Sequence, residues 1–269
     1  MKKNAVITGG GSGMGLETAK LLGDYSLILV GRTVSKLEGA VEELKALGIE
    51  VEAFPADISD YDSVKNLASY AANKGQVELV LHGAGVSPHM TDAEKIFEIN
   101  SLGTVYMNQA FGEVMEGGCI LNVASMAGYM LPEAHAPIDL YKLSLVSPQE
   151  FLGAAKAMLN SMPEETSRGS SYTISKHFVR WYTEKMALQL GKKGIRVVSI
   201  SPGTFSTPMG EVEGKQAEAM ALMGALGRVG EPIEIAKMMN FILRDSYLTG
   251  TDVLYDGGSI AAVREKQAQ

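Results

Sequence analysis

An ordered set of residues with complementary chemistry runs through this chain. It begins with a glycine-rich turn over Thr8–Gly15 and continues with Asn100, Ser125, and Tyr172 with Lys176 one helical turn later. Glycines in such a turn let backbone N–H groups approach the pyrophosphate of a dinucleotide. A hydroxyl, a phenol and an amine can polarise a carbonyl and supply its proton. Together these residue types predict hydride transfer between a dinucleotide and a carbonyl or alcohol carbon.

The spacing of the later residues suggests a role for each. Tyr172 and Lys176 are four residues apart, so on a helix they share one face, where an ammonium would stabilise the phenolate. We expect Tyr172 to act as the acid or base, Ser125 to hydrogen-bond the reacting oxygen, and Lys176 also to reach the nicotinamide ribose. Asn100 would hold a water against Lys176. Taken singly, each has an ordinary alternative: Ser125 could be a hydroxyl at a strand end, Asn100 an amide on a helix surface, and Tyr172 an aromatic residue at a helix start.

The first turn has the spacing Thr-Gly-x-x-x-Gly-x-Gly and joins a short apolar run to a segment of helical length. This differs from the Gly-x-Gly-x-x-Gly of many dinucleotide-binding proteins. Its glycines permit a tight turn, and the helix N-terminus that follows favours a pyrophosphate. The alternative is a plain connection between a strand and a helix. The residues of this turn expected to bind the cofactor are Thr8, Gly9, Ser12, Gly13, Met14 and Gly15.

The end of the second apolar run indicates which dinucleotide binds. An NAD site usually places an acidic residue there against the ribose hydroxyls. This chain has Gly31, Arg32 and Thr33 instead. The guanidinium of Arg32 can grip a 2′-phosphate with several planar donors, and Lys36 lies close enough to assist. These residues favour NADP(H), although Arg32 could also be a solvated charge that leads into a helix.

Asp57 and Ile58 follow the third apolar run. The Asp57 carboxylate could accept a hydrogen bond from the adenine amino group while Ile58 packs on the ring. Asp57 could equally cap the helix that starts near Tyr61. Both residues are therefore candidates for the adenine end of the cofactor site.

Composition fits a single enzyme domain over residues 1–269. With 269 residues, 46% of them hydrophobic, the chain can bury a sizeable core. The net charge of -7 argues against a nucleic-acid partner, which needs clustered Lys and Arg. The N-terminal apolar stretch runs straight into glycines, unlike a secretory signal, and the apolar runs are too short to span a membrane. We therefore expect a cytoplasmic protein with no nucleic-acid or membrane partner.

Cysteine and histidine usage narrows the chemistry further. The single cysteine, Cys119, cannot form an intramolecular disulfide, and its place in an apolar run suggests burial. The histidines show no metal-ligand spacing, so no metal site is expected.

Short apolar runs alternate with amphipathic segments of helical length along the chain. Apolar strands separated by helices predict a parallel sheet covered on both faces, with ligands beyond the carboxyl ends of the strands. The expected fold class is α/β, a doubly wound Rossmann-like parallel sheet with helices on both faces. The expected strands are Ala5–Thr8, Ser26–Val30, Val51–Pro55, Val77–His82, Cys119–Ala124, Ile195–Ser201 and Asp252–Tyr255. The expected helices are Gly15–Leu22, Val34–Leu47, Tyr61–Asn73, Thr91–Val105, Tyr172–Leu190 and Pro232–Leu243.

In order and spacing, these motifs resemble the short-chain dehydrogenase/reductase superfamily over nearly the whole chain. The matching motifs are Thr8–Gly15, Asp57, Ala84-Gly85, Asn100, Ser125, Tyr172-x-x-x-Lys176, and Pro202-Gly203 with Thr207. The resemblance implies a catalytic tetrad of Asn100, Ser125, Tyr172 and Lys176. It implies that Thr207 binds the nicotinamide carboxamide, with further cofactor contacts from Ala84, Gly85, Tyr172, Lys176, Pro202 and Gly203. The stretch 248–258 is similar to the family's last strand, which implies a homo-oligomer, a tetramer or a dimer.

The chain departs from the family pattern in two places. The common Asn-Asn-Ala-Gly after the fourth strand begins with His82 here, which we expect to be a hydrogen-bonded structural residue rather than a proton donor. Ser125 and Tyr172 are also farther apart than usual, which predicts an inserted subdomain at about 126–170. Such an insertion resembles that of bacterial hydroxysteroid dehydrogenase/carbonyl reductases. It would lie at the mouth of the site or at the surface of a neighbouring subunit.

The two segments without a clear pattern, 126–170 and a substrate loop at about 203–230, are rich in methionine. Methionines suit an adaptable apolar cavity, although a core or interface position would explain most of them individually. They are Met126, Met130, Met158, Met162, Met209, Met220 and Met223. The sequence predicts an NADP(H)-dependent ketone and secondary-alcohol oxidoreductase with a bulky apolar substrate, first of all a hydroxysteroid or bile acid. The alternatives are a 3-oxoacyl or general xenobiotic carbonyl reductase, and a non-catalytic NADP(H)-sensing protein.

Overall fold

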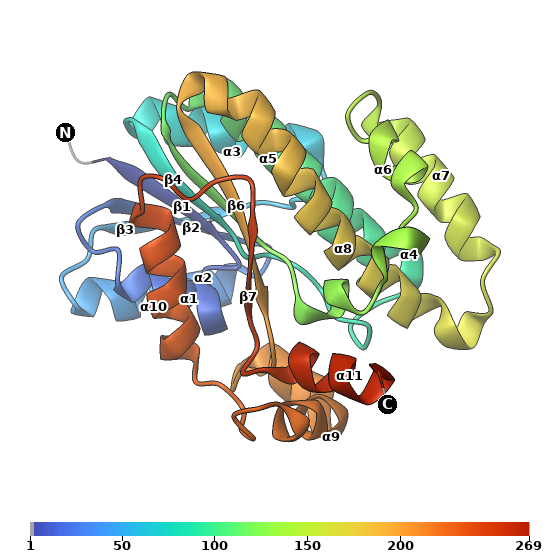
Figure 1. Ribbon diagram of the computed structural model, residues 1–269. Helices are drawn as coiled ribbons and strands as arrows, with labels where there is room; N and C mark the ends of the chain where they lie inside the picture. Colours follow the sequence, from blue (N-terminus) through green and yellow to red (C-terminus); the bar gives the residue numbers. More distant parts are fainter. Residues whose placement is uncertain (1–2, 269) are drawn as a thin grey trace.

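The computed structural model describes residues 3–268, which are built around a parallel sheet (Figure 1). In this part of the chain the sheet has seven strands in the order β3-β2-β1-β4-β5-β6-β7. All neighbouring strands in it pair in parallel. The strands are β1 (Asn4–Thr8), β2 (Ser26–Gly31), β3 (Val51–Pro55), β4 (Val77–His82), β5 (Gly118–Val123), β6 (Ile195–Pro202) and β7 (Asp252–Tyr255). The expected strands are confirmed, with small shifts at their ends.

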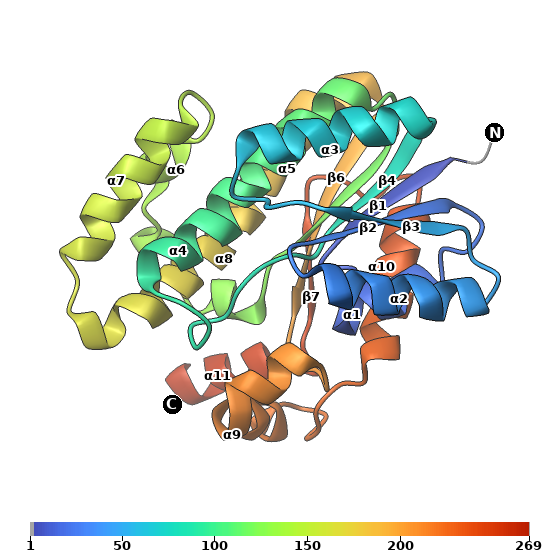
Figure 2. The same cartoon turned by 180° about the vertical axis from the view of Figure 1, so that it is seen from behind.

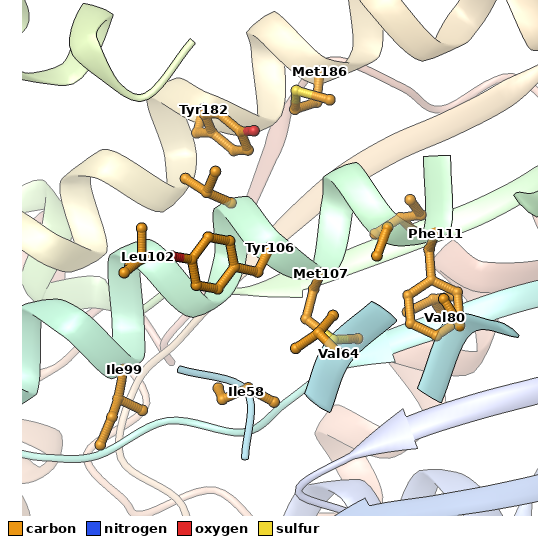
Figure 3. Close-up of a cluster of buried hydrophobic side chains, with 14 of the residues drawn as sticks. Ile58, Val64, Val80, Ile99, Leu102, Tyr106, Met107, Phe111, Tyr182 and Met186 are labelled. Atoms are coloured by element: carbon orange, nitrogen blue, oxygen red, sulfur yellow. The ribbon is translucent and has the colours of Figure 1, made fainter. Parts of the chain in front are cut away.

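Helices cover both faces of this sheet, which confirms the doubly wound class (Figure 1, Figure 2). One face carries α3 (Tyr61–Lys74), α4 (Ala93–Phe97), α5 (Gly103–Val114) and α8 (Glu164–Leu190). The other carries α1 (Gly13–Lys20), α2 (Val34–Ala46) and α10 (Pro232–Arg244). Successive strand side chains point to opposite faces, so Val6 and Val80 join one buried core while Ile7 and Leu81 join the other. Figure 3 shows Val80 among the buried side chains of the first core.

The carboxyl ends of the central strands position the site. The strand order reverses between β1 and β4, which are neighbours in the sheet but not in the sequence. The connections on either side of such a point diverge to opposite faces, and this leaves a crevice outside the strand ends. The glycine-rich turn after β1 and the loop after β4 therefore meet at this crevice.

Two expected helices differ from the structure by more than two residues at an end, and the others by one or two. The segment expected as one helix over Thr91–Val105 consists of α4, a π-helix η1 over Glu98–Leu102, and α5. Helix α8 begins at Glu164 rather than at Tyr172, because Pro163 precedes it and two acidic residues occupy its first turn. Tyr172 therefore lies about two turns inside a helix and not at its start.

Both segments that lacked a clear pattern contain helices. These are α6 (Ile138–Leu143), α7 (Pro148–Asn160) and α9 (Pro208–Met223), with short 3₁₀ turns at η2 (Met126–Tyr129) and η3 (Glu133–His135). A further 3₁₀ turn, η4 (Gly191–Lys193), follows α8, and α11 (Ser259–Ala268) follows β7.

Helices α6 and α7 pack beside α4 and α8, at the side of the molecule (Figure 2). The Phe151 ring of α7 is buried, with its centre 4.7 Å from that of Phe178 and 5.1 Å from that of Phe97. The Tyr141 hydroxyl of α6 donates to the Ile174 carbonyl oxygen at 3.1 Å. The aromatic side chains of these helices therefore bury against α8, and the position of the segment at the mouth of the site or at the surface of a neighbouring subunit stays a prediction. Met158 and Met162 pack against this same core.

Candidate functional site

The glycine-rich turn has the backbone shape that its sequence predicts. Gly9 and Gly13 have φ angles of 70° and 56°, in the left-handed region that favours glycine. A Cβ on Gly15 would lie 2.5 Å from the Gly9 carbonyl oxygen, so α1 can approach the turn this closely only with a glycine. Ser12 caps α1 without a side-chain hydrogen bond to the helix backbone. Its hydroxyl and the first N–H groups of α1 can therefore receive a pyrophosphate.

A buried hydrogen-bonded group joins this turn to the loop after β4. The Thr8 hydroxyl oxygen lies 3.0 Å from His82 Nδ1 and accepts from the Ala84 N–H at 3.0 Å. Burial, with help from the Lys176 charge, lowers the pKa of His82 to about 3, so its imidazole is neutral at pH 7. A neutral imidazole nitrogen can accept the Thr8 hydroxyl proton. This geometry agrees with a structural role for His82.

Basic side chains gather at the carboxyl end of β2. Arg32, Thr33 and Lys36 are exposed, and with Gly31 they line one end of a cleft. Thr33 caps α2 without a side-chain hydrogen bond to the helix backbone. Two cations and a helix N-terminus therefore face the same part of the cleft, an arrangement suited to a phosphate.

Asp57 lines the same cleft, and its pKa is lowered. Burial alone would raise this pKa, but hydrogen bonds from Ser59 and the charge of Arg32 outweigh the burial. Asp57 Oδ1 accepts from the Ser59 backbone N–H at 2.9 Å and from the Ser59 hydroxyl at 2.7 Å. The alternative that Asp57 caps α3 is wrong, because Asp60 is the N-cap and accepts from the Asp62 N–H at 3.0 Å.

Thr207 brings the start of α9 against the glycine turn. A Cβ on Gly13 would lie 3.4 Å from Thr207 Cβ. Thr207 Oγ1 accepts a backbone N–H from the first turn of α9 at 3.2 Å, which leaves its hydroxyl proton able to donate. Just before it, a Cβ on Gly203 would lie 2.7 Å from Asp256 Cα. The loop that begins at Pro202 and Gly203 can therefore approach the end of β7 closely.

The cleft brings together most of the predicted cofactor residues. Those that line it are Gly9, Ser12, Gly13, Met14, Gly15, Gly31, Arg32, Thr33, Asp57, Ile58, Ala84, Gly85 and Thr207. The predicted residues outside this lining are Thr8, Tyr172, Lys176, Pro202 and Gly203. Val86, Met90 and Met239 also line the cleft and were not expected. Val86 directly follows Ala84-Gly85 and had a local signal, whereas nothing near Met239 in the sequence connects α10 with this site.

Ser125 follows β5 at the same edge of the sheet. Its backbone is extended, and its Oγ accepts from the Ala127 N–H at 3.2 Å. Because the oxygen accepts this bond, its hydroxyl proton is able to point toward a reacting oxygen. Ser125, at the end of a central strand, is therefore able to act as a donor.

Asn100 lies in the π-helix between α4 and α5. Its Oδ1 accepts from the Val86 N–H at 2.9 Å, and its Nδ2 donates to the Val86 carbonyl oxygen at 3.0 Å. Nδ2 also lies 3.3 Å from the Ser175 hydroxyl oxygen on α8. The amide thus joins three elements of the site, and a water between Asn100 and Lys176 stays a prediction.

Gly85 is the place where the cofactor cleft meets the tetrad. It lines the cleft, and a Cβ on it would lie 3.0 Å from Asn100 Oδ1 and 3.5 Å from Lys176 Nζ. Lys176 is buried and donates to the Val123 carbonyl oxygen at 3.0 Å. Its Nζ is 5.8 Å from the centre of the Tyr172 ring. The shared helix face expected for Tyr172 and Lys176 is therefore confirmed.

Other reactive groups are placed away from this chemistry. Cys119 is buried as expected, and burial raises the pKa of its thiol to about 12. Among residues 3–268, no group of histidine, cysteine and acidic side chains is arranged to hold a metal ion. In the same part of the chain, no helix has the length and apolar character needed to cross a membrane.

Comparison with known proteins identifies the class. Residues 3–137 match the family model described as short chain dehydrogenase, and residues 156–259 match one described as Enoyl-(Acyl carrier protein) reductase. The chain therefore belongs to the short-chain dehydrogenase/reductase family, whose members are oxidoreductases that act on alcohol and ketone groups.

Individual relatives agree with this assignment over nearly their whole length. The chain is 30% identical over 272 residues to Short-chain dehydrogenase/reductase bsc3 of Alternaria brassicicola, with 97% of each chain covered. It is 29% identical over 272 residues to Cyclohexanol dehydrogenase of Acinetobacter sp. (strain SE19), covering 95% of this chain and 94% of that one. Among solved structures, Levodione Reductase superposes with a TM-score of 0.77 at 26% identity, covering 97% of this chain and 98% of that one.

Proposed function

We propose that this protein interconverts a ketone and a secondary alcohol with NADP(H), acting on a bulky apolar substrate. The junction at Gly85 is the observation that carries this proposal. There the cleft formed by the glycine turn reaches Asn100 and Lys176, whose polar atoms would be 3.0 and 3.5 Å from a Cβ at that position. A dinucleotide that follows the cleft would therefore end beside the tetrad.

The residues of the cleft fit a phosphorylated dinucleotide. The glycines of the turn leave room for a pyrophosphate at the N-terminus of α1. The Ser12 side chain makes no capping hydrogen bond there and is able to contact it. Arg32 and Lys36 would contact the 2′-phosphate, since β2 ends in Gly31 and offers no carboxylate there to repel it. When bound, NADPH would supply the hydride. Thr207 would donate to the carboxamide and so fix the position of the nicotinamide.

The proton chemistry belongs to side chains of this protein. Tyr172 would donate its phenolic proton to the oxygen of the ketone during reduction and take it back during oxidation. Ser125 would hydrogen-bond the same oxygen, and the Lys176 ammonium would stabilise the phenolate left behind. Asn100 would hold this arrangement through its bonds to Val86 and Ser175.

Apolar residues in the cleft lining support an apolar substrate. Met90 and Met209 both line the cleft, and neither is fully buried. Methionine adapts to different apolar shapes and would tolerate a fused-ring skeleton. A hydroxysteroid or bile acid remains our first choice, and the relative named for cyclohexanol supports a cyclic alcohol. This choice is argued from the lining of the cleft, and the contribution of the segment 126–170 to substrate binding stays a separate prediction.

A screen that follows NADPH absorbance tests the proposal. Steroid ketones, oxidised bile acids, small cyclic ketones and 3-oxoacyl thioesters should be compared with NADPH and with NADH. We expect reduction of cyclic ketones, fastest with NADPH. Turnover confined to 3-oxoacyl thioesters would favour the relative named 3-oxoacyl-[acyl-carrier-protein] reductase FabG as the better guide, at 26% identity over 274 residues. NADPH binding without turnover of any ketone would favour a cofactor-sensing protein.

We also propose that the protein is a homo-oligomer. Strand β7 is at one edge of the sheet, and all four of its residues are only partly buried. An open strand edge can pair with another chain. Light scattering coupled to size exclusion would measure the mass, and a value near that of one chain would contradict this proposal.

A further inference from the structure

A second cavity lies away from the cofactor cleft and shares none of its lining residues. It has a volume of about 260 Å³ and lies between the segment from Tyr129 to Glu133 and helix α11. Arg180 of α8 contributes to its wall. Figure 1 shows α11 and the green segment that contains η2 on the same side of the molecule. This volume is slightly below the usual range for ligand sites, which suits a small molecule.

Two guanidinium groups lie close to one aromatic ring in this cavity. The Arg180 guanidinium carbon is 3.6 Å from the centre of the Tyr129 ring, and that of Arg264 is 5.7 Å from it. Both distances are within the range of cation–π attraction, which holds each cation near the ring. Two positive charges are thereby brought together at one side of a concave site. Glu133, which also lines the cavity, and Asp252 lie 3.8 and 3.7 Å from Arg180 nitrogens and offset its charge, so Arg264 is the cation that would attract an anion.

Arg180 has donors that make no short hydrogen bond. One of its terminal nitrogens donates to the Gly128 carbonyl oxygen at 3.0 Å. Its Nε is 3.7 Å from Asp252 Oδ2, and its other terminal nitrogen is 3.8 Å from Glu133 Oε1. These distances exceed those of hydrogen bonds, and within residues 3–268 the buried Nε has no hydrogen-bond partner.

The two neighbouring carboxylates form ion pairs with Arg180 but not with Arg264. Asp252 accepts from the Tyr129 hydroxyl at 2.8 Å and from the Ser199 hydroxyl at 2.6 Å, and its Oδ2 is 3.7 Å from Arg180 Nε. The Glu133 side chain is 74% exposed, so water screens its charge. Among the described residues, no ion pair joins Arg264 to an acidic side chain.

The rest of the wall is largely apolar. Met130 and Leu131 form one side, and Ile260 and Val263 of α11 form the other. Gln267 adds an amide on the same helix as Arg264. A ligand that matches this lining has a planar anionic head for the guanidinium groups and a short apolar tail for the walls.

We propose that this cavity binds a small carboxylic acid, with its carboxylate at Arg264 and Arg180 and its hydrocarbon part between η2 and α11. The site is separate from the cofactor cleft, so the proposal does not depend on the proposed oxidoreductase activity. A carboxylate fits because its two oxygens match the fork of a guanidinium.

Calorimetric titration with octanoate and with octanamide tests this proposal, because the two probes have the same length and only one is charged. Titrations should use the intact protein, with and without saturating NADPH. We expect octanoate to bind at least roughly ten-fold more tightly than octanamide, since bonds to charged groups exceed those to neutral ones. NADPH should not compete. Equal binding of the two probes, or loss of octanoate binding with NADPH, would overturn the proposal.

Two variants of α11 locate the site. Arg264→Ala removes the exposed cation of the cavity and should weaken octanoate binding roughly ten-fold or more. Lys266→Ala is the matched control, because it removes one positive charge from the same helix but does not line the cavity. We expect it to bind octanoate as the wild type does. Both residues are exposed, so neither change should unfold the protein. If the two substitutions weakened octanoate binding equally, the attraction would be a general effect of charge, and the proposed site would be refuted.

Discussion

Lowering the pH from 7 to 5 should reduce the free energy of unfolding, because His82 is buried in its neutral form. The pKa of His82 in the fold is about 3 because of its burial, whereas an exposed histidine has a pKa of about 6.5. Below pH ~6.5 the unfolded chain therefore takes up a proton that the folded chain refuses. Stability is complete above this value and falls as the pH drops toward 3. With 1.36 kcal/mol for each unit, the loss at pH 5 is about 2 kcal/mol.

Urea unfolding of the wild type and His82→Asn over this pH range would measure the effect. An asparagine can still hydrogen-bond the Thr8 hydroxyl but does not titrate. The difference between the two proteins cancels the carboxylates and also His177, whose pKa burial lowers as well. We expect this difference to move by about 2 kcal/mol in favour of the variant between pH 7 and pH 5. Parallel profiles would show that His82 does not remain neutral in the fold, and the reasoning would fail.

Three further variants test the site and its support. Gly31→Asp with Arg32→Ser should move preference from NADPH toward NADH by about 1.5–3 kcal/mol in binding. Gly31 has room for a Cβ, so unchanged preference in fluorescence titrations would remove Arg32 from the phosphate site. Gly15→Ala places a Cβ 2.5 Å from the Gly9 carbonyl oxygen and should weaken NADPH binding while ketone affinity at saturating cofactor stays the same. Phe151→Ala should lower the free energy of unfolding by about 3–5 kcal/mol, since its ring is fully buried, and a loss below about 1 kcal/mol in urea would contradict its place in the core.

The central strands and the glycine turn were predictable because their physics is local. A buried parallel strand needs a continuous apolar run, and the turn needs glycine at Gly9 and Gly13, where φ is positive. The helix face shared by Tyr172 and Lys176 follows from their spacing alone. These local features account for most of the cofactor cleft.

Other features depend on contacts that spacing does not encode. The π-helix at Asn100 breaks the regular helical period, so a periodic pattern predicts only one longer helix there. Helix α9 contains Gly214 with φ of 65°, which interrupts its pattern in the same way. The aromatic packing of Phe151 on Phe178 determines where α7 lies, and it joins residues from two separate segments. For the same reason Met239 could not be assigned to the cleft.

The same limit applies to the segment between Ser125 and Tyr172. Its position in the sequence predicts a place at the mouth of the site or at the surface of a neighbouring subunit, but spacing does not encode that Tyr141 and Phe151 are fully buried parts of the core beside α8. Shortening this segment should therefore destabilise the fold rather than only change substrate range. The turn η2, directly after Ser125, packs against the tetrad helix, because a Cβ on Gly128 would lie 2.8 Å from the Lys176 carbonyl carbon.

The central claim is that Tyr172 supplies the proton in an NADPH-dependent ketone reduction, and Tyr172→Phe tests it most directly. A rapid-mixing experiment should combine the NADPH-loaded wild type or variant with a ketone found in the screen and follow a single turnover. We expect NADPH binding to stay almost unchanged, because the ring is kept, and the rate of turnover to fall by about 10²–10⁴-fold. A variant that binds NADPH and reduces the ketone at nearly the wild-type rate would contradict the account.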